Sequence, residues 1–260
     1  MAAMAARTVS DLNGVRALVT GGTSGLGRAM AEALALAGAE VVVTSRDRER
    51  ASDAANGLGA GARGWAMDVR EPDAVSSAVD QIYDELGGLD LLVCNAGVGM
   101  RTVNPRFLSQ PQPFWEVSAD GFRNVVDTKI VGTFLVARAV VPRMLSDGGR
   151  VVVISMNVET MTRAGFVPYG PSGAAVEALA QVMAADLAAT SVRLNVLLPG
   201  GATATGMIPD DVSPEVRARL LDPAIMGPPI VWLASPEAAD VHGERITATE
   251  FEQWRSQRAR

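Results

Sequence analysis

Three glycines, Gly21, Gly25 and Gly27, lie between a short apolar segment and a helical pattern, with the spacing of a phosphate-binding turn. Glycine lets the backbone turn tightly and lets a phosphate approach the main chain. The free N–H groups and positive dipole end of the next helix would face that phosphate. In a chain with 26 glycines an ordinary strand-to-helix turn is the alternative. The predicted phosphate-binding residues are Gly21, Thr23, Ser24, Gly25, Leu26 and Gly27.

The elements that would position this turn alternate between strand and helix along the chain. This alternation predicts an α/β protein, a single-domain Rossmann-like doubly wound parallel sheet of about seven strands with helices on both faces. Residues 1–13 have no periodicity and are predicted to be a loose lead-in, and residues 251–260 form a polar tail of unknown role. We expect strands over 15–20, 40–45, 63–67, 89–94, 150–155, 192–198 and 244–249, and helices over 25–37, 47–58, 72–86, 118–145, 168–190, 214–220 and 223–234.

Composition limits the class of protein. A chain of 260 residues, 48% of them hydrophobic, is long enough for one large α/β domain over 1–260. It has no apolar run of about 20 residues and no signal peptide, which predicts a protein outside the membrane. One cysteine, Cys94, favours a reducing, cytoplasmic compartment, and the lone His242 leaves no cluster for a metal. A net charge of −6 argues against nucleic-acid binding.

The glycine spacing, T-G-x-x-x-G-x-G, resembles that of the short-chain dehydrogenase/reductase family, and later segments agree in order and distance over about the whole chain. Residues 94–97 are similar to the family's N-N-A-G, residues 193–200 to its R-x-N-x-x-x-P-G, and Tyr169 to its catalytic tyrosine. The resemblance implies a nicotinamide cofactor, a small-molecule substrate, a homodimer or homotetramer, and a substrate lid over 200–222. It places Asn95, Ala96, Gly97, Tyr169, Pro199 and Gly200 at the cofactor, and also Thr205 if one residue is inserted after Gly200.

The end of the second predicted strand indicates which cofactor is preferred. In NAD-preferring relatives an acidic residue there binds the ribose hydroxyls, whereas this chain has Ser45 followed by Arg46. A guanidinium suits a 2′-phosphate, so NADP(H) is favoured, with NAD(H) possible. The alternative is that Arg46 is solvated, like Arg48 and Arg50. In the family a pair corresponding to Asp68 and Val69 contacts the adenine, although Asp68 could equally cap the next helix.

A long loop over 98–117 departs from the family pattern. Its aromatic residues Phe107, Phe114 and Trp115 are candidates for lining a substrate pocket at the carboxyl edge of the sheet. The alternative is that the loop packs onto the domain or between subunits.

Proton transfer beside a carbonyl or alcohol oxygen can be performed by a phenol whose pKa is lowered by a nearby cation. The family combines its tyrosine with a lysine four residues later, a serine thirteen residues earlier and an asparagine on the long helix. Here Gly173 stands at the lysine position and Met156 at the serine position, so Ser155 is the nearest hydroxyl. The candidate catalytic residues are Tyr169, Ser155 and Lys129.

Lys129, the only lysine, stands at the family's asparagine position and is a candidate for relocation of the missing charge. The alternative is that Lys129 points to solvent or pairs with Asp127 or another carboxylate. Two functions follow. One is an NADP(H)-dependent carbonyl reductase or alcohol dehydrogenase with Tyr169 as acid or base. The other is a nucleotide-binding protein without hydride transfer, either an inactivated variant or a scaffold, regulator or non-redox catalyst.

Overall fold

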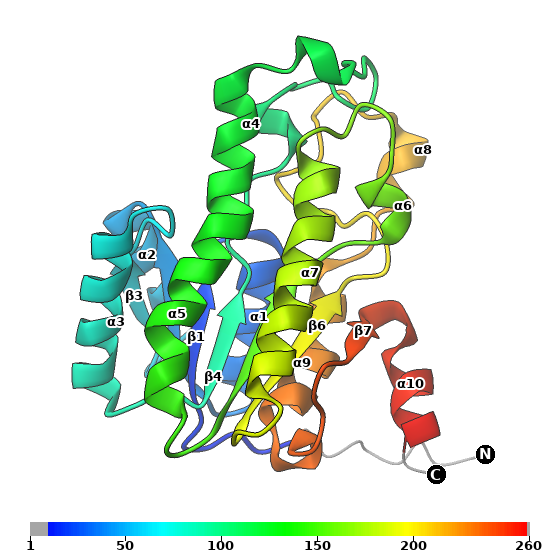
Figure 1. Ribbon diagram of the computed structural model, residues 1–260. Helices are drawn as coiled ribbons and strands as arrows, with labels where there is room; N and C mark the ends of the chain where they lie inside the picture. Colours follow the sequence, from blue (N-terminus) through cyan, green and yellow to red (C-terminus); the bar gives the residue numbers. More distant parts are fainter. Residues whose placement is uncertain (1–9, 259–260) are drawn as a thin grey trace.

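The computed structural model describes residues 10–258, which are organised around one parallel sheet with strand order β3-β2-β1-β4-β5-β6-β7 (Figure 1). Every pair of neighbouring strands is parallel. The order reverses between β1 and β4, so the predicted doubly wound sheet is confirmed. The strands are β1 (Arg16–Thr20), β2 (Glu40–Ser45), β3 (Arg63–Ala66), β4 (Leu91–Cys94), β5 (Gly149–Ile154), β6 (Val192–Leu198) and β7 (Arg245–Thr247).

Helices cover both faces of the sheet, and each face carries its own apolar core. Because both faces are buried, the central strands are almost continuously apolar. One face is covered by α1 (Gly25–Leu36), α2 (Arg48–Asn56) and α9 (Gly227–Ala234). The other, in front of the sheet in Figure 1, is covered by α3 (Pro72–Leu86), α5 (Gly132–Met144) and α7 (Tyr169–Leu187). No helix within residues 10–258 is both long enough and apolar enough to cross a bilayer.

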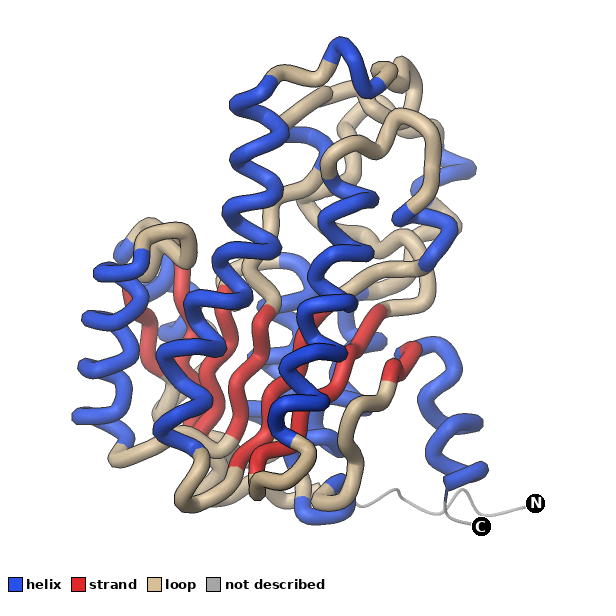
Figure 2. The backbone as a smooth tube through the Cα atoms, viewed as in Figure 1, coloured by secondary structure: helices blue, strands red, loops and turns tan. Residues whose placement is uncertain are grey.

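Loops and short helices gather beyond the carboxyl ends of the strands, above the sheet in Figure 2. In a doubly wound sheet the ligand crevice lies at this edge, where the strand order reverses. The short elements of the chain are α6 (Val158–Met161), α8 (Pro214–Arg217), η1 (Met100–Thr102), η2 (Phe114–Glu116), η4 (Pro223–Met226), η5 (Pro236–Ala238) and η6 (Ala248–Glu250).

The helix predicted over 118–145 contains an irregular turn. It begins as α4 (Ala119–Val126), capped by the Ser118 hydroxyl, which accepts from the N–H of Gly121. It then passes through a π-helical turn, η3 (Asp127–Val131), and continues as α5. At the end of that turn a Cβ on Gly132 would lie only 2.6 Å from Val69 Cγ2, so the turn packs closely against the loop after β3.

Both ends of the described chain differ from the prediction. The supposed polar tail forms a helix, α10 (Phe251–Arg258), whose residue Phe251 is buried and whose Trp254 ring lies 5.6 Å from the Trp232 ring. Most of the predicted lead-in lies outside the described residues. Leu12, however, is fully buried and donates its N–H to the carbonyl of Ala37, so "loose" is wrong for that part.

Candidate active site

The turn between β1 and α1 leaves the start of the helix open. Ser24 precedes α1 in an extended conformation and its side chain makes no capping hydrogen bond. Gly21 and Gly25 have positive φ angles of 64° and 55°, which glycine adopts without strain. A Cβ on Gly27 would collide with the Gly21 carbonyl and the Asn95 amide. The turn therefore needs its glycines and presents free N–H groups where an anion could bind.

The segment after β4 braces this turn. The Thr20 hydroxyl accepts from the N–H groups of Asn95 and Ala96, both at 3.0 Å. The Asn95 amide nitrogen donates to the carbonyls of Thr20 and Gly21 at 3.0 and 3.2 Å. The ends of β1 and β4, the neighbouring strands at the switch point, are thus joined. The Asn95 side chain supports the turn.

Charged residues gather beyond β2 and β3. Arg46 is exposed, and Ser45 accepts from the N–H of Asp47. The Arg70 guanidinium binds Asp68 at 2.6 Å and also donates to Asn124. The hydrogen bond from Arg70, with the added positive charge of Arg46, lowers the pKa of Asp68.

The alternative role of Asp68 as a helix cap is wrong. Glu71 is the N-cap of α3, and Asp68 lies outside the helix. Arg70 was missed by the sequence reasoning, although it is a basic residue only two positions after Asp68.

Tyr169 is the first residue of α7 and is half-buried. Burial raises the pKa of the phenol, whose hydroxyl lies 3.8 Å from the Met207 sulfur. Tyr169 packs against a small apolar cluster in which Phe107 and Phe166 meet edge to face at 5.3 Å. Phe107 therefore lies at the predicted site, whereas its two companions Phe114 and Trp115 are 67% and 72% exposed and pack on each other.

The predicted lid connects the glycine turn to the phenol. Thr205 Cγ2 lies 3.2 Å from where a Cβ on Gly25 would be, and Met207 donates its N–H to the Thr205 hydroxyl at 3.3 Å. Met207 also contacts the Tyr169 hydroxyl. The consecutive residues Thr205, Gly206 and Met207 of the predicted lid therefore reach from the glycine turn to the phenol.

Arg101 joins the predicted lid segment to η1. Its guanidinium donates to the carbonyls of Gly206 and Ile208 and pairs with Asp210 at 2.7 Å. Nothing local in the sequence indicates this contact, which joins residues more than a hundred positions apart.

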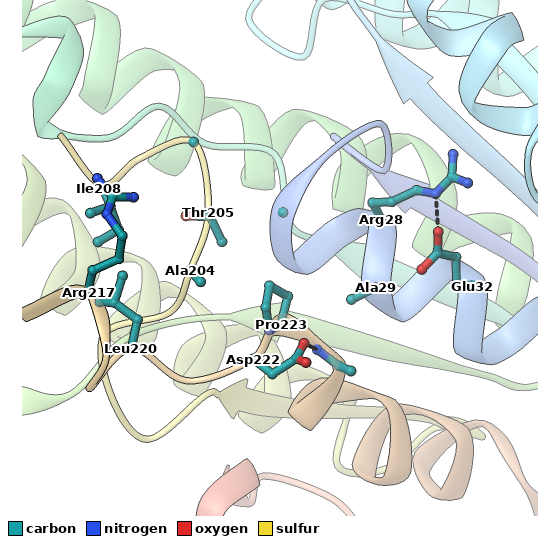
Figure 3. A pocket seen from close by; sticks show the side chains of 13 residues that line it. Arg28, Ala29, Glu32, Ala204, Thr205, Ile208, Arg217, Leu220, Asp222 and Pro223 are labelled. Carbon is teal, nitrogen blue, oxygen red and sulfur yellow. Dashed lines mark hydrogen bonds and ion pairs between the residues drawn. The ribbon is translucent and has the colours of Figure 1, made fainter. Parts of the chain in front are cut away.

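A cavity of about 630 Å³ lies between the start of α1 and the predicted lid segment (Figure 3). Gly25, Arg28 and Glu32 border one side, where Arg28 and Glu32 pair at 2.6 Å, and lid residues including Thr205 and Arg217 border the other. Its volume lies within the range of small-molecule sites.

The remaining predicted positions lie at the same sheet edge. Pro199 and Gly200 follow β6, where Gly200 has a φ of 96° and accepts from the Asn157 amide. Ser155 directly follows β5, and its hydroxyl is buried without a hydrogen-bond partner among the described residues.

The structure brings Lys129 to Tyr169. The Lys129 nitrogen lies over the phenol ring, 5.6 Å from its centroid, and the side chain is buried. Within residues 10–258 it forms no ion pair with Asp127 or any other carboxylate. The pKa of Lys129 is lowered to about 8 by burial, which the negative charge of Glu177 partly opposes.

The surroundings of Cys94 and His242 indicate structural roles for both residues. Burial raises the pKa of Cys94 to about 12. His242 accepts the N–H of Leu194 and contacts the Ala184 carbonyl through its other nitrogen. In the described part of the chain no group of three or more His, Cys, Asp or Glu residues could hold a metal ion.

Comparison with known proteins agrees with this geometry. Residues 16–215 match the short chain dehydrogenase family. A 3-oxoacyl-[acyl-carrier-protein] reductase of Vibrio cholerae is 31% identical over 91% of this chain and 96% of its own. A putative short-chain alcohol dehydrogenase from Sinorhizobium meliloti superposes with a TM-score of 0.80 at 30% identity, covering 94% and 99% of the two chains. A 3-ketoacyl-(acyl-carrier-protein) reductase from Brucella melitensis, solved with NADH, gives 0.81 at 26% identity, with coverage of 91% and 97%. This chain therefore belongs to the short-chain dehydrogenase/reductase family.

Proposed function

We propose that this protein is an NADP(H)-dependent oxidoreductase that interconverts a carbonyl group and a secondary alcohol, with Tyr169 as acid or base. The observation that carries the proposal is the lid segment from Thr205 to Met207, which contacts the glycine turn at one end and the phenol at the other. A reacting carbon held beside Tyr169 would then lie close to a dinucleotide bound at the turn. Membership of the family and its reductase relatives support the same reading.

The residues at the turn fit a dinucleotide. The start of α1 has no side-chain cap, and the glycines leave room for a diphosphate. At the adenosine end Arg46 is exposed and position 45 carries no carboxylate, which favours a 2′-phosphate and so NADP(H) over NAD(H). The bound cofactor would supply or accept the hydride.

Tyr169 would donate its hydroxyl proton to the substrate oxygen during reduction and take one back during oxidation. Its present neighbour, the Met207 thioether, is a weak acceptor. A substrate oxygen in that place would form a stronger hydrogen bond. Ser155 is the candidate second donor to the substrate, because its buried hydroxyl has no partner among the described residues.

The protein is further proposed to be a homodimer or homotetramer and to work in the cytoplasm. Two aromatic side chains on the long helix, Phe122 and Phe134, are 42% and 45% exposed on a monomer. Contact with a second copy of the chain would bury these two side chains. Light scattering of the purified protein measures the oligomeric state.

A second candidate is a nucleotide-binding protein without hydride transfer. It is favoured by Gly173 and Met156, which stand where family members carry a lysine and a serine. Under this reading the glycine turn still binds a dinucleotide, while Tyr169 has no catalytic role.

One experiment separates the two. NADPH and NADH are titrated against the protein, and turnover is then measured with a panel of ketones, alcohols and 3-oxoacyl thioesters. We expect NADPH-dependent reduction that falls about a hundredfold or more in Tyr169→Phe, a typical loss for an acid–base group. Tight cofactor binding without turnover on any substrate would favour the second candidate, and turnover unchanged in Tyr169→Phe would overturn the assignment of Tyr169.

A further inference from the structure

The space beside Gly173 is filled by Met156. A Cβ built on Gly173 would lie 2.8 Å from both the sulfur and the terminal methyl carbon of Met156, and both residues are buried. The Met156 backbone is also held, because its carbonyl accepts from Arg245 at 3.0 Å. A lysine at position 173 and the methionine at position 156 would compete for one volume. The two departures from the family pattern are therefore one coupled packing change.

Lys129 is a buried cation that lies over the ring of Tyr169. It reaches the phenol from η3, and its side chain is 9% exposed. The ammonium makes no hydrogen bond or ion pair with any residue in the span 10–258, and its nitrogen lies over the Tyr169 ring, 5.6 Å from the centroid. Burial of a charge without a partner costs free energy, so a lysine without a role is not expected here.

The charged neighbours of Lys129 do not neutralise it. Glu177 on α7 is a carboxylate whose charge acts on Lys129, and both of its oxygens accept from the Arg245 guanidinium at 3.0 Å. Asp127 lies on the same π-helical turn and forms no ion pair with Lys129. The positive charge of Lys129 is thus directed at the phenol.

We propose that Lys129 is a positioning residue that supplies Tyr169, from the long helix, with the positive charge that the family supplies from α7. This rests on the proposed role of Tyr169. When Tyr169 gives up its proton, the phenolate that forms is stabilised by a cation held at the ring, and in the reverse direction the same cation raises the fraction of Tyr169 that is ionised and able to take a proton. Burial raises the pKa of Tyr169, and a cation close to the phenol opposes such a rise. The pKa of Lys129, about 8, leaves the lysine charged at neutral pH.

The test measures the effect of the Lys129 charge on the ionisation of the Tyr169 phenol and does not require turnover. The chain has two tyrosines, so Tyr83→Phe leaves Tyr169 as the only one. The buried Tyr83 hydroxyl has no hydrogen-bond partner among residues 10–258, so this substitution removes no such contact. Tyr169 is then replaced biosynthetically by a polyfluorinated tyrosine. Its more acidic phenol ionises in the pH range where Lys129 is still charged. Fluorine NMR follows the ionisation midpoint in this background with Lys129, Lys129→Arg or Lys129→Met.

We expect the midpoint to rise by about one pH unit or more in Lys129→Met, a tenfold weaker acid, and to stay within a few tenths of a unit in Lys129→Arg. A purely structural lysine would leave the midpoint unchanged in Lys129→Met, and that result would overturn the proposal. If the midpoint moves while no variant turns over any substrate, the proposed function fails and the charge relation stands. If turnover is present and the midpoint does not move, the proposed function stands and the charge relation between Lys129 and Tyr169 fails.

Discussion

Gly173 faces Met156 so closely that any side chain at position 173 must displace the methionine, whose sulfur would lie 2.8 Å from the new Cβ. This contact determines how the family's lysine can be restored. The atoms in the way are the far end of a flexible side chain, so the displacement is possible, but the core is closely packed and extra methylenes there typically cost about 1–3 kcal/mol.

We therefore expect Gly173→Lys alone to lower the melting temperature and to gain little turnover. The double variant Met156→Ser/Gly173→Lys makes room for the ammonium and offers a hydroxyl, and it should exceed the starting protein at least tenfold in kcat. Met156→Ser alone is the control. Equal gains in Gly173→Lys and in the double variant would contradict the packing argument.

Arg46→Asp should exchange the cofactor preference. Loss of one charge-assisted hydrogen bond to a 2′-phosphate is worth about 1.5–3 kcal/mol, so NADPH binding should weaken about tenfold to a hundredfold while NADH binding is kept or improved. Isothermal titration of both cofactors measures this. Arg48→Asp is the matched control, since it changes the same charge at another exposed position just inside α2. If both variants weaken NADPH equally, Arg46 acts only through general charge.

Gly27→Ala should disrupt the turn. The added Cβ collides with the Gly21 carbonyl and the Asn95 amide, so the braced strand ends must separate. We expect a loss of about 2 kcal/mol or more in the free energy of unfolding, with dinucleotide binding at least tenfold weaker. Gly206→Ala is the control, because nothing lies within 4 Å of its new Cβ. A Gly27→Ala protein as stable as this control would show that the turn yields more easily than its contacts indicate.

Local pattern was enough to predict much of the fold. The bounds of β2, α3 and β6 agree with the prediction because each has strong signals of its own, such as Pro72 at the start of α3 and the left-handed Gly87 after its end. The π-helical turn was not predicted, because the spacing of Val126, Ile130 and Phe134 across it fits one continuous α-helix. Helix α10 was missed because only Phe251 and Trp254 along it face the core.

The candidate site was predictable in its parts and less so in their arrangement. The glycine turn and Tyr169 stand in recognisable motifs, whereas the contact of Met156 with Gly173 and the approach of Lys129 to Tyr169 depend on how side chains pack between distant segments. Whether these residues act as the resemblance implies stays a prediction.

Arg101→Ala should loosen the lid. The guanidinium holds two lid carbonyls and Asp210, and its loss leaves the Ser109–Asp211 hydrogen bond as a remaining link between the two loops. We expect backbone amides over 204–217 to exchange with solvent about tenfold faster, with little change in the melting temperature because the contact lies at the surface. Arg106→Ala, at an exposed position on the same loop, is the control. Unchanged exchange over these residues would mean that the lid is held mainly by its own packing.

The buried charge of Lys129 makes the stability of the protein depend on pH. Burial lowers its pKa from 10.5 in the unfolded chain to about 8 in the folded protein, so the folded state binds the lysine proton less tightly. Below pH 8 the folded protein carries the buried charge at a cost. Between about pH 8 and 10.5 the unfolded chain holds more protons, and the free energy of unfolding contributed by this residue rises with pH. Lys129→Met removes the charge and keeps a flexible apolar side chain.

Lys129→Met should therefore be more stable than the starting protein at pH 7, by roughly 1–3 kcal/mol, and this advantage should shrink to nothing near pH 10.5. Lys129→Arg stays charged throughout and should lack the rise above pH 8. Urea unfolding at a series of pH values measures all three proteins. If Lys129→Met is less stable at pH 7, the ammonium has favourable contacts that outweigh its burial. A variant that gains stability while losing catalytic proton transfer would identify Lys129 as a residue kept for function at the expense of stability.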